Sequence, residues 1–336
     1  MLLRRLDIAR PLSLPHRTSR TYRIGSRMSF STYLITPSEL NTTLSSRPPT
    51  LKILCASWFL PTSAHTGPSV FKASHIPSAR FFDLDAVKDP SSPYPHMMPS
   101  AHDFSTAMSS LGVTQTDTVV IYDSRELGLF SAPRVGWMLK AFGHEKVHVL
   151  DNYKIWCQQG LPTESGDVPP LKVEERVEYG QAKEPGDVVV GFEEMEAGAR
   201  RRFSDKETNE RTVVLDARPR GRWTGEAPEP RKGLSSGHMP GSVSLPASEV
   251  LDPETGGMLP KEKLREVFGK AGVTEESRVI CSCGTGVTAA ILETALGVAG
   301  LGEEKGEGKR RIYDGSWTEW AMRVDEEGGL IEKGEK

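Results

Sequence analysis

The stretch from Arg278 to Leu296 reads RVICSCGTGVTAAILETAL and contains three local signals in series. Val279 and Ile280 open a short apolar run of the β-branched residues that favour a buried strand. A loop bounded by Gly284 and Gly286 follows, and the remaining residues carry apolar side chains at helical spacing. This order predicts a strand, a tight loop and a helix, which is the repeating unit of a parallel α/β sheet.

The pattern around this stretch is present twice in the chain. Two pairs of segments correspond: SHIPSARFFDLD (74–85) with GHMPGSVSLPASEV (237–250), and VHVLDNYKIW (147–156) with RRIYDGSWTEW (310–320). His75 and His238 are separated by the same number of positions as Asp151 and Asp314. A single offset shared by several markers indicates a duplication. We therefore predict two α/β domains of similar architecture, each a mostly parallel sheet flanked by helices.

Length and composition agree with this division. The chain has 336 residues, of which 37% are hydrophobic and 26% charged, as expected for a globular protein of about two domains. We place the first domain at 33–160, a linker at 161–185, the second domain at 186–325 and a charged tail at 326–336. The net charge of -3 gives no general attraction to nucleic acid or to anionic membrane. No apolar run approaches the roughly 20 residues of a membrane span.

The N-terminal segment has a different composition. Its first 27 residues contain seven arginines and a single acidic residue, Asp7. Such arginine-rich, acid-poor segments are typical of mitochondrial presequences, so we expect one at residues 1–30. The alternative is a basic tail without a targeting role. Initiation at Met28 would give a second, cytoplasmic form that lacks the signal.

The cysteines indicate the chemistry. Four in the whole chain are too few for a secreted disulfide framework, so free thiols are expected. Where a strand ends and a helix begins, loop N–H groups and the helix N-terminus favour a nucleophilic thiolate. Cys283 begins the loop, whereas Cys281 lies in the predicted strand and is expected to pack as a small apolar residue. The alternatives are a metal site, which lacks a second Cys/His pair at ligand spacing, and a strained disulfide.

Longer motifs resemble a known family. They are CGTGVTAA, DARPRGRWTGEAPEPRKGLSSGHMPGSV and YDGSWTEW in the second copy, with FFDLDAVKDPSSPYPHMMPSAHDF and GLFSAPRVGWMLKAFGH in the first. These segments resemble the tandem-domain sulfurtransferases of the rhodanese superfamily, rhodanese and 3-mercaptopyruvate sulfurtransferase, over residues 35–325. The resemblance implies two rhodanese-like domains, each with a mostly parallel five-stranded sheet, and an enzyme that transfers sulfane sulfur without a cofactor or metal.

The resemblance also implies roles for particular residues. Cys283 matches the cysteine that carries the persulfide, and the N–H groups after it would stabilise the persulfide anion. The other implied residues are Arg222, Arg231, Gly284, Gly286, Val287 and Thr288 for substrate binding, and Thr285, His96 and Asp85 for proton transfer. The two arginines suit a carboxylate, because a guanidinium binds it with two hydrogen bonds. Neighbouring Arg218 is expected to form a structural ion pair instead.

The loop after the cysteine bears on the sulfur donor. Rhodaneses that prefer thiosulfate carry basic side chains directly after the cysteine, whereas Gly284 and Thr285 match the 3-mercaptopyruvate enzymes. The resemblance implies 3-mercaptopyruvate as main donor, thiosulfate as a poorer one, and a thiol, cyanide or a thioredoxin-like protein as acceptor. Two alternatives stay open: thiosulfate:cyanide sulfurtransferase as main activity, and a non-enzymatic rhodanese-like interaction module. A phosphatase of the same fold would need an arginine where this chain has Ala289.

The first copy departs from the active pattern. It reads VIYDSRELGLFSA, which puts Asp123 near the position of Cys283. A carboxylate cannot form a persulfide, so we expect the first domain to be catalytically silent. It would contribute one wall of a cleft between the domains, with Arg125 and Glu126 as candidates for that wall.

Overall fold

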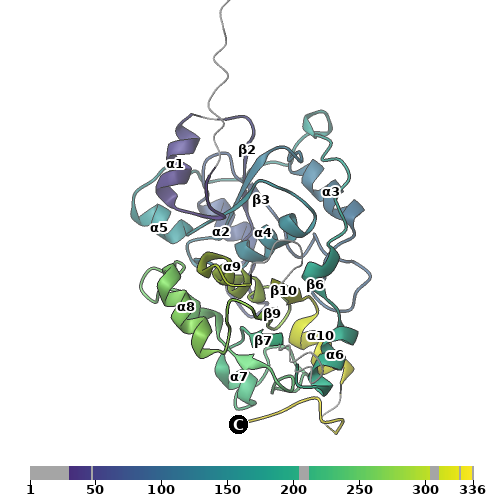
Figure 1. Ribbon diagram of the computed structural model, residues 1–336. Coiled ribbons are helices and arrows are strands. Elements are labelled where there is room, and N and C mark those ends of the chain that lie inside the picture. The colour runs from purple at the N-terminus through teal and green to yellow at the C-terminus, as the bar shows by residue number, and fades with distance from the viewer. Residues whose placement is uncertain (1–29, 47, 204–211, 303–309, 325–326, 335–336) are drawn as a thin grey trace, which may run out of the picture.

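A computed structural model of the chain describes residues 30–46, 48–203, 212–302, 310–324 and 327–334 (Figure 1). The predicted presequence lies outside these ranges except for Phe30. The described residues form two five-stranded sheets, and all neighbouring strands within them are parallel. The predicted α/β fold class with two tandem sheets is therefore confirmed.

The first sheet has the strand order β1-β5-β4-β2-β3. Its strands are β1 (Leu34–Ile35), β2 (Leu51–Cys55), β3 (Arg80–Phe81), β4 (Thr118–Tyr122) and β5 (Val147–Leu150). The helices of this half are α1 (Pro37–Ser45), α2 (Gly67–Ala73), α3 (Ala101–Ser110), α4 (Ala132–Ala141) and α5 (Tyr153–Gln158). The central strand β4 is buried over most of its length, as expected for a strand covered on both faces.

The second sheet repeats this order as β6-β10-β9-β7-β8. Its strands are β6 (Val189–Val190), β7 (Thr212–Asp216), β8 (Val243–Ser244), β9 (Arg278–Ser282) and β10 (Arg310–Tyr313). The helices are α6 (Phe192–Arg200), α7 (Arg220–Thr224), α8 (Lys261–Lys270), α9 (Ala289–Ala299) and α10 (Ser316–Arg323), with 3-10 turns at Val173–Glu175, Gly186–Val188 and Ala247–Val250. The duplicated sequence pattern thus corresponds to a duplicated fold, strand for strand.

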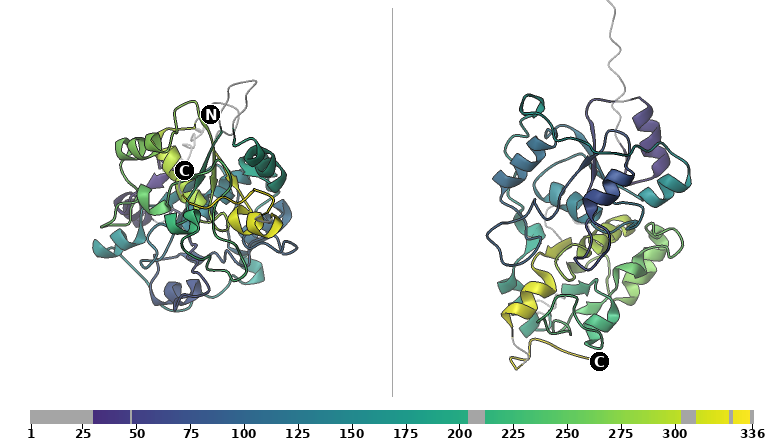
Figure 2. Two further views of the ribbon diagram at one scale, coloured as in Figure 1. Left: turned by 90° about the horizontal axis from the view of Figure 1, so that it is seen from below. Right: turned by 180° about the vertical axis from the view of Figure 1, so that it is seen from behind.

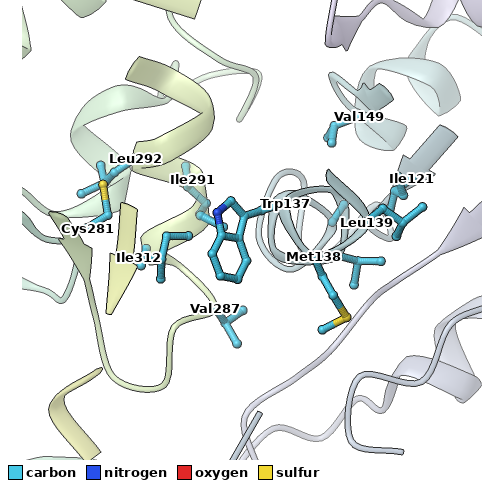
Figure 3. Packing of buried hydrophobic residues seen from close by; sticks show 14 of the residues in the cluster. Ile121, Trp137, Met138, Leu139, Val149, Cys281, Val287, Ile291, Leu292 and Ile312 are labelled. Carbon is cyan, nitrogen blue, oxygen red and sulfur yellow. The ribbon is translucent and has the colours of Figure 1, made fainter. Parts of the chain in front are cut away.

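The two halves meet along α4 and α9. Figure 1 and the right view of Figure 2 show the first half above the second, and Figure 1 labels α4 and α9 near the junction. Trp137 on α4 and Ile291 on α9 belong to one apolar cluster that contains residues of both sheets (Figure 3). All residues of α9 from Ala289 to Leu296 are buried, because the helix lies between its own sheet and the first domain. The halves therefore share one core.

The segment 161–185, predicted to be a linker, packs on the first domain: its first part pairs with His75 through Glu164, and its last part contacts α3. The N–H groups of Tyr179 and Ala182 donate to the hydroxyls of Ser109 and Ser105, both at 3.0 Å, and both linker side chains are buried. Among the helices in the described ranges, none has the length and apolar character required to cross a membrane.

Candidate active site

The predicted nucleophile is the first residue after β9. Cys283 is 2% exposed, and hydrogen bonds join its backbone to the start of α10. Its N–H donates to the hydroxyl of Ser316 at 3.1 Å, and its carbonyl accepts from the N–H of Trp317 at 2.9 Å. The carbonyl of Gly284 accepts from the N–H and the hydroxyl of Thr318 at 3.0 and 2.7 Å. These bonds fix the backbone at the cysteine without using its sulfur.

The loop 284–288 then leads into α9. Within the described part of the chain, the N–H groups of these residues donate to no acceptor, so they remain available to an anion. Gly286 has a φ of 75°, and a Cβ there would lie 2.8 Å from the carbonyl oxygen of Asp314 and 2.9 Å from Nη1 of Arg134. The left-handed backbone and the close approach both require glycine.

The competing thiol is buried in the core. Cys281 lies on β9, in the apolar cluster that also contains Leu292 (Figure 3). Burial raises the pKa of the Cys281 thiol well above its ordinary value. A buried neutral thiol is a poor nucleophile, so the structure supports a packing role for this residue.

A hydrogen-bonded chain crosses from the first domain to the cysteine loop. Nδ1 of His96 lies 3.1 Å from the hydroxyl oxygen of Thr285, and Nε2 lies 3.1 Å from Oδ1 of Asp85. The indole N–H of Trp58 donates to Oδ2 of Asp85 at 3.0 Å, and its ring packs edge-on against His96 at 4.6 Å. The structure therefore brings together the three residues that the resemblance implies for proton transfer.

Their protonation states follow from their partners. The hydrogen bond from His96 lowers the pKa of Asp85, so its carboxylate is ionised and can only accept. Nε2 of His96 therefore carries the proton, and in the neutral ring Nδ1 accepts from the Thr285 hydroxyl. Burial lowers the pKa of His96, against the opposing effect of Asp85, which favours this neutral ring. In this protonation state, Nδ1 of His96 can accept a proton from the hydroxyl of Thr285.

One of the arginines near the cysteine is structural. Arg218 is 1% exposed and forms ion pairs with Asp216 at 2.6 Å and Glu229 at 2.9 Å. Its guanidinium also donates to the carbonyl of Gly237 at 2.7 Å and lies over the Trp317 ring at 4.2 Å. The predicted structural ion pair is present. Glu229 also pairs with Arg222. The sequence did not predict this role, because no local pattern indicates which acidic residue will contact two arginines.

The two arginines predicted to bind substrate differ in their surroundings. Arg222 donates through Nε to Glu229 at 3.0 Å and makes a second, shorter contact to the same carboxylate. No residue in the described ranges forms a hydrogen bond or an ion pair with the guanidinium of Arg231. Burial lowers the pKa of Arg231, and the charge of Arg222 lowers it further, whereas negative charge on Cys283 would raise it. Arg231 is therefore the cation most open to an anionic ligand beside the cysteine.

Both arginines and the cysteine line a cavity of about 380 Å³ between the domains. The second domain supplies Arg218, Arg222, Arg231, Cys283, Gly284, Thr285, Val287 and Thr288. Gly286 is the one residue of the implied substrate-binding set that does not line it, since its Cα faces Asp314 and Arg134.

The opposite wall comes from the first domain and is apolar. It consists of Trp58, Leu60, Leu127, Leu129 and Phe130. The candidates Arg125 and Glu126 do not line the cavity and pair with each other instead, at 3.5 Å. The sequence does not reveal this wall, because its side chains face the cysteine only once the domains are docked.

The fold and the site define a class of protein: an α/β protein of two similar domains with a cysteine at a strand-to-helix loop beside two arginines. Comparison with known proteins agrees. A family model described as "Rhodanese-like domain" matches residues 199–323. The 3-mercaptopyruvate sulfurtransferase of Rattus norvegicus is 39% identical over 278 residues, which cover 82% of this chain and 87% of that protein.

Two further relatives extend the likeness over most of the chain. Thiosulfate/3-mercaptopyruvate sulfurtransferase 1, mitochondrial, of Arabidopsis thaliana is 38% identical over 288 residues, 83% of this chain and 74% of that protein. The crystal structure of Tum1 protein from Saccharomyces cerevisiae superposes with a TM-score of 0.78 at 34% identity, covering 90% of this chain and 98% of that one. The chain belongs to the rhodanese superfamily of tandem-domain sulfurtransferases, and it is an enzyme that transfers sulfur.

Proposed function

We propose that the enzyme transfers sulfur from 3-mercaptopyruvate to an acceptor through a persulfide on Cys283. The observation that carries this choice of donor is the hydrogen-bonded chain Thr285–His96–Asp85 beside the cysteine. A proton must be moved when 3-mercaptopyruvate is the donor, and this chain is built to move one. Thiosulfate needs no such step.

In the first half-reaction the thiolate of Cys283 attacks the donor sulfur. An S–S bond forms, and the C–S bond breaks with its electron pair passing to C3 of the donor. The leaving group is the enolate of pyruvate, and the proton of the donor thiol must reach C3. We assign this transfer to Thr285 and His96, with Asp85 stabilising the imidazolium that forms.

Substrate binding is assigned to the two arginines of the cavity. Arg231 would bind the donor carboxylate, and Arg222, fixed by Glu229, would add a second cation. Gly284, Val287 and Thr288 complete the wall around the reacting sulfur. The free N–H groups of 284–288 would stabilise the persulfide anion after pyruvate leaves.

In the second half-reaction an acceptor thiolate attacks the outer sulfur. It leaves with that sulfur as a persulfide, and the thiolate of Cys283 is restored. A small thiol or a thioredoxin-like protein would accept sulfur in this way, and cyanide, which attacks through its carbon, would leave as thiocyanate. The cavity of about 380 Å³ has an apolar wall with Leu127 and Phe130, which supports acceptors that carry apolar surface as well as the small polar donor.

A second candidate activity is the use of thiosulfate. The Arabidopsis thaliana relative is named for both donors, and the Arg222–Arg231 pair would attract a dianion as well as a carboxylate. We propose thiosulfate as the poorer donor, because the loop after Cys283 carries no basic side chain.

We also propose that residues 186–325 form the catalytic domain and that residues 33–160 form a catalytically silent domain. Asp123 follows β4 as Cys283 follows β9, so the first domain has no thiol at the corresponding place. Its part would be to supply His96, Asp85 and the apolar wall.

We also propose that residues 1–30 direct one form to mitochondria and that initiation at Met28 gives a cytoplasmic form. The arginine-rich composition supports this, and so does the mitochondrial relative in Arabidopsis thaliana. Fusing residues 1–30 to a fluorescent reporter tests it. A reporter that stays wholly in the cytoplasm would exclude the targeting role.

Steady-state kinetics with both donors side by side test the proposed reaction. We expect a higher kcat/KM with 3-mercaptopyruvate than with thiosulfate, and a mass increase of about 32 Da, one sulfur atom, on the Cys283 peptide after donor is added. Equal kcat/KM values would remove the case for 3-mercaptopyruvate as main donor. Absence of both turnover and mass increase would favour the interaction module.

A further inference from the structure

A fully buried arginine of the first domain reaches into the second. Arg134 on α4 is 0% exposed, and its Nη2 donates to Oδ1 of Asp314 at 2.5 Å and to the carbonyl of His96 at 2.7 Å. Its Nη1 lies 3.5 Å from the carbonyl of Gly286 in the cysteine loop. One guanidinium thus contacts the backbone at both ends of the hydrogen-bonded chain between His96 and Thr285.

The backbone of His96 needs such support. Its φ of 62° lies in the left-handed region, which costs a residue with a Cβ about 1 kcal/mol or more. Arg134 holds the carbonyl of His96, and Oδ2 of Asp314 accepts the N–H of Met98 at 2.7 Å. The ion pair between Arg134 and Asp314 therefore holds the segment 96–98 at two points.

The same pair packs against the cysteine loop. A Cβ on Gly286 would meet the Asp314 carbonyl and Arg134 Nη1, so the loop backbone lies directly on both residues. Gly286 follows Thr285, whose hydroxyl lies 3.1 Å from His96 Nδ1. The ion pair Arg134–Asp314 thus fixes the hydroxyl oxygen of Thr285 relative to Nδ1 of His96. These two residues and Asp85 form the proposed proton relay.

The other side of the domain interface provides an internal comparison. Asp151, the counterpart of Asp314, accepts the N–H of Met258 across the interface at 2.9 Å. Among the described residues, no cation pairs with Asp151: the third residue of α4 is Arg134, but the third residue of α9 is Ile291. Asn152 and Lys154 add hydrogen bonds to the carbonyls of Thr255 and Glu254 on this side of the interface, and neither involves an arginine. In the part of the chain that the structure describes, the buried arginine lies on the side of His96 and Thr285.

Stability alone is a weak reason for this arginine. A buried ion pair loses much of its attraction to desolvation, and an apolar pair of similar volume is often as stable. We propose that Arg134 is a positioning residue, which holds His96 and the Thr285 loop at the distance that proton transfer requires. This inference rests on the proposed function, because it assumes that the relay serves 3-mercaptopyruvate.

The positioning role is tested by measuring kcat and KM of Arg134 variants with each of the two donors. In Arg134→Met we expect kcat with 3-mercaptopyruvate to fall about 100-fold, because an error of about 1 Å in placing a catalytic group has that effect. The KM for 3-mercaptopyruvate should change less than about threefold, since Arg222 and Arg231 are untouched, and thiosulfate turnover should change equally little. Arg134→Lys should recover part of the loss, because an ammonium can reach some of the acceptors without the planar fork.

Two further variants separate positioning from folding. Arg134→Met leaves Asp314 buried without its cation, so Arg134→Met/Asp314→Asn is measured in parallel, with thermal unfolding of both. Asp151→Ala is the matched control: it removes the equivalent hydrogen bond on the other side and should lower stability while leaving the ratio of the two donor activities unchanged.

The outcomes are distinguishable. Equal losses with both donors in a folded double variant, or a rise in KM as large as the fall in kcat, would overturn the inference. If His96→Asn lowers the donor ratio but the Arg134 variants do not, the positioning role is wrong and the proposed function stands. If His96→Asn leaves the ratio unchanged, the relay itself is wrong and both proposals fall.

Discussion

The loop after β4 and the loop after β9 occupy the same place in two copies of one fold. Each begins with the residue that follows the central strand, Asp123 in the first copy and Cys283 in the second. The carboxylate of Asp123 accepts the N–H groups of Phe130, Ser131 and Ala132 at 2.7 to 2.9 Å. In the second copy the N–H groups after the cysteine have no acceptor in the described residues.

The difference shows how one anion-binding turn serves two purposes. In the first domain the turn is occupied by its own side chain, and the Ser131 hydroxyl adds a fourth hydrogen bond at 2.6 Å. In the second domain the turn is left open beside a thiol, so an anion formed during the reaction can occupy it. The first loop is also longer, and its extra residues supply Leu127, Leu129 and Phe130 to the cleft.

The sharpest test of this comparison removes the proposed nucleophile. Cys283→Ser should reduce turnover with either donor by at least about a thousandfold and abolish the mass increase, because a hydroxyl does not form a persulfide. Cys281→Ala is the control and should keep most of the activity, since that thiol only packs. Activity that followed Cys281 instead would transfer the nucleophile to the strand.

Removing the relay base should have the next largest effect. His96→Asn, in which asparagine tolerates the left-handed backbone, should lower kcat with 3-mercaptopyruvate by about a thousandfold and change thiosulfate turnover much less. The exposed His102→Asn serves as control. An unchanged rate with 3-mercaptopyruvate would contradict the relay.

The pH profile checks the same residue independently. Burial, with smaller contributions from Arg134 and Arg231, lowers the pKa of His96 against the effect of Asp85. A lowered pKa means that the ring stays neutral, and able to accept a proton, as the pH falls through its ordinary value. The acid limb of kcat/KM for 3-mercaptopyruvate should therefore lie below about pH 6.5, and it should be absent from His96→Asn.

Asp123, which occupies the turn of the first domain, should make the free energy of unfolding depend on pH. Burial raises the pKa of Asp123 to about 6, although its hydrogen bonds oppose the shift. A raised pKa means that the folded state favours the protonated carboxyl, so stability from this group is present below about pH 4 and is lost as the pH rises through 6. Relative to Asp123→Asn, the unfolding free energy of the wild type should fall by about 3 kcal/mol across this range.

Asparagine suits this comparison because it can keep the hydrogen bonds. Its carbonyl can accept the three N–H groups while its amide donates to the Ser131 hydroxyl oxygen. Denaturant unfolding at several pH values measures the difference. A difference that is flat from pH 4 to 7 would show that Asp123 does not titrate there.

The smallest expected effect concerns substrate binding. Arg231→Ala should raise the KM for 3-mercaptopyruvate by about tenfold, because it removes a charged hydrogen bond to the carboxylate. Arg220→Ala, an exposed neighbour outside the cleft, is the matched control. A KM that is the same in both variants would leave Arg231 without a binding role.

Much of the fold was predictable because its signals are local. The strand, loop and helix of 278–296 follow from residue types in one window, and the duplication follows from two such windows at one offset. Different roles could be predicted for Cys283 and Cys281 because one follows the strand and the other lies within it. The resemblance added His96 and Asp85, which are 189 and 198 positions from Thr285 and Cys283 respectively, and no periodicity could have paired them.

The parts that the sequence missed depend on tertiary packing. Leu127 and Phe130 form the cleft wall, and Arg134 joins α4 to Asp314, only when the two domains dock. Glu229 pairs with two arginines of its own domain. None has a local signature, since a glutamate or an arginine on a predicted surface looks the same whether or not another part of the chain will cover it.

The sequence by itself determined the two α/β domains, the thiol at the end of a central strand and the absence of one in the first copy. These depend on short-range periodicity and on the chemistry of single residues. Only the tertiary structure decided which N–H groups stay open, which arginine is left for a ligand and how His96 comes to face Thr285. These depend on how segments far apart in the chain pack together, and the meeting of His96 with Thr285 depends on the docking of the two domains along α4 and α9.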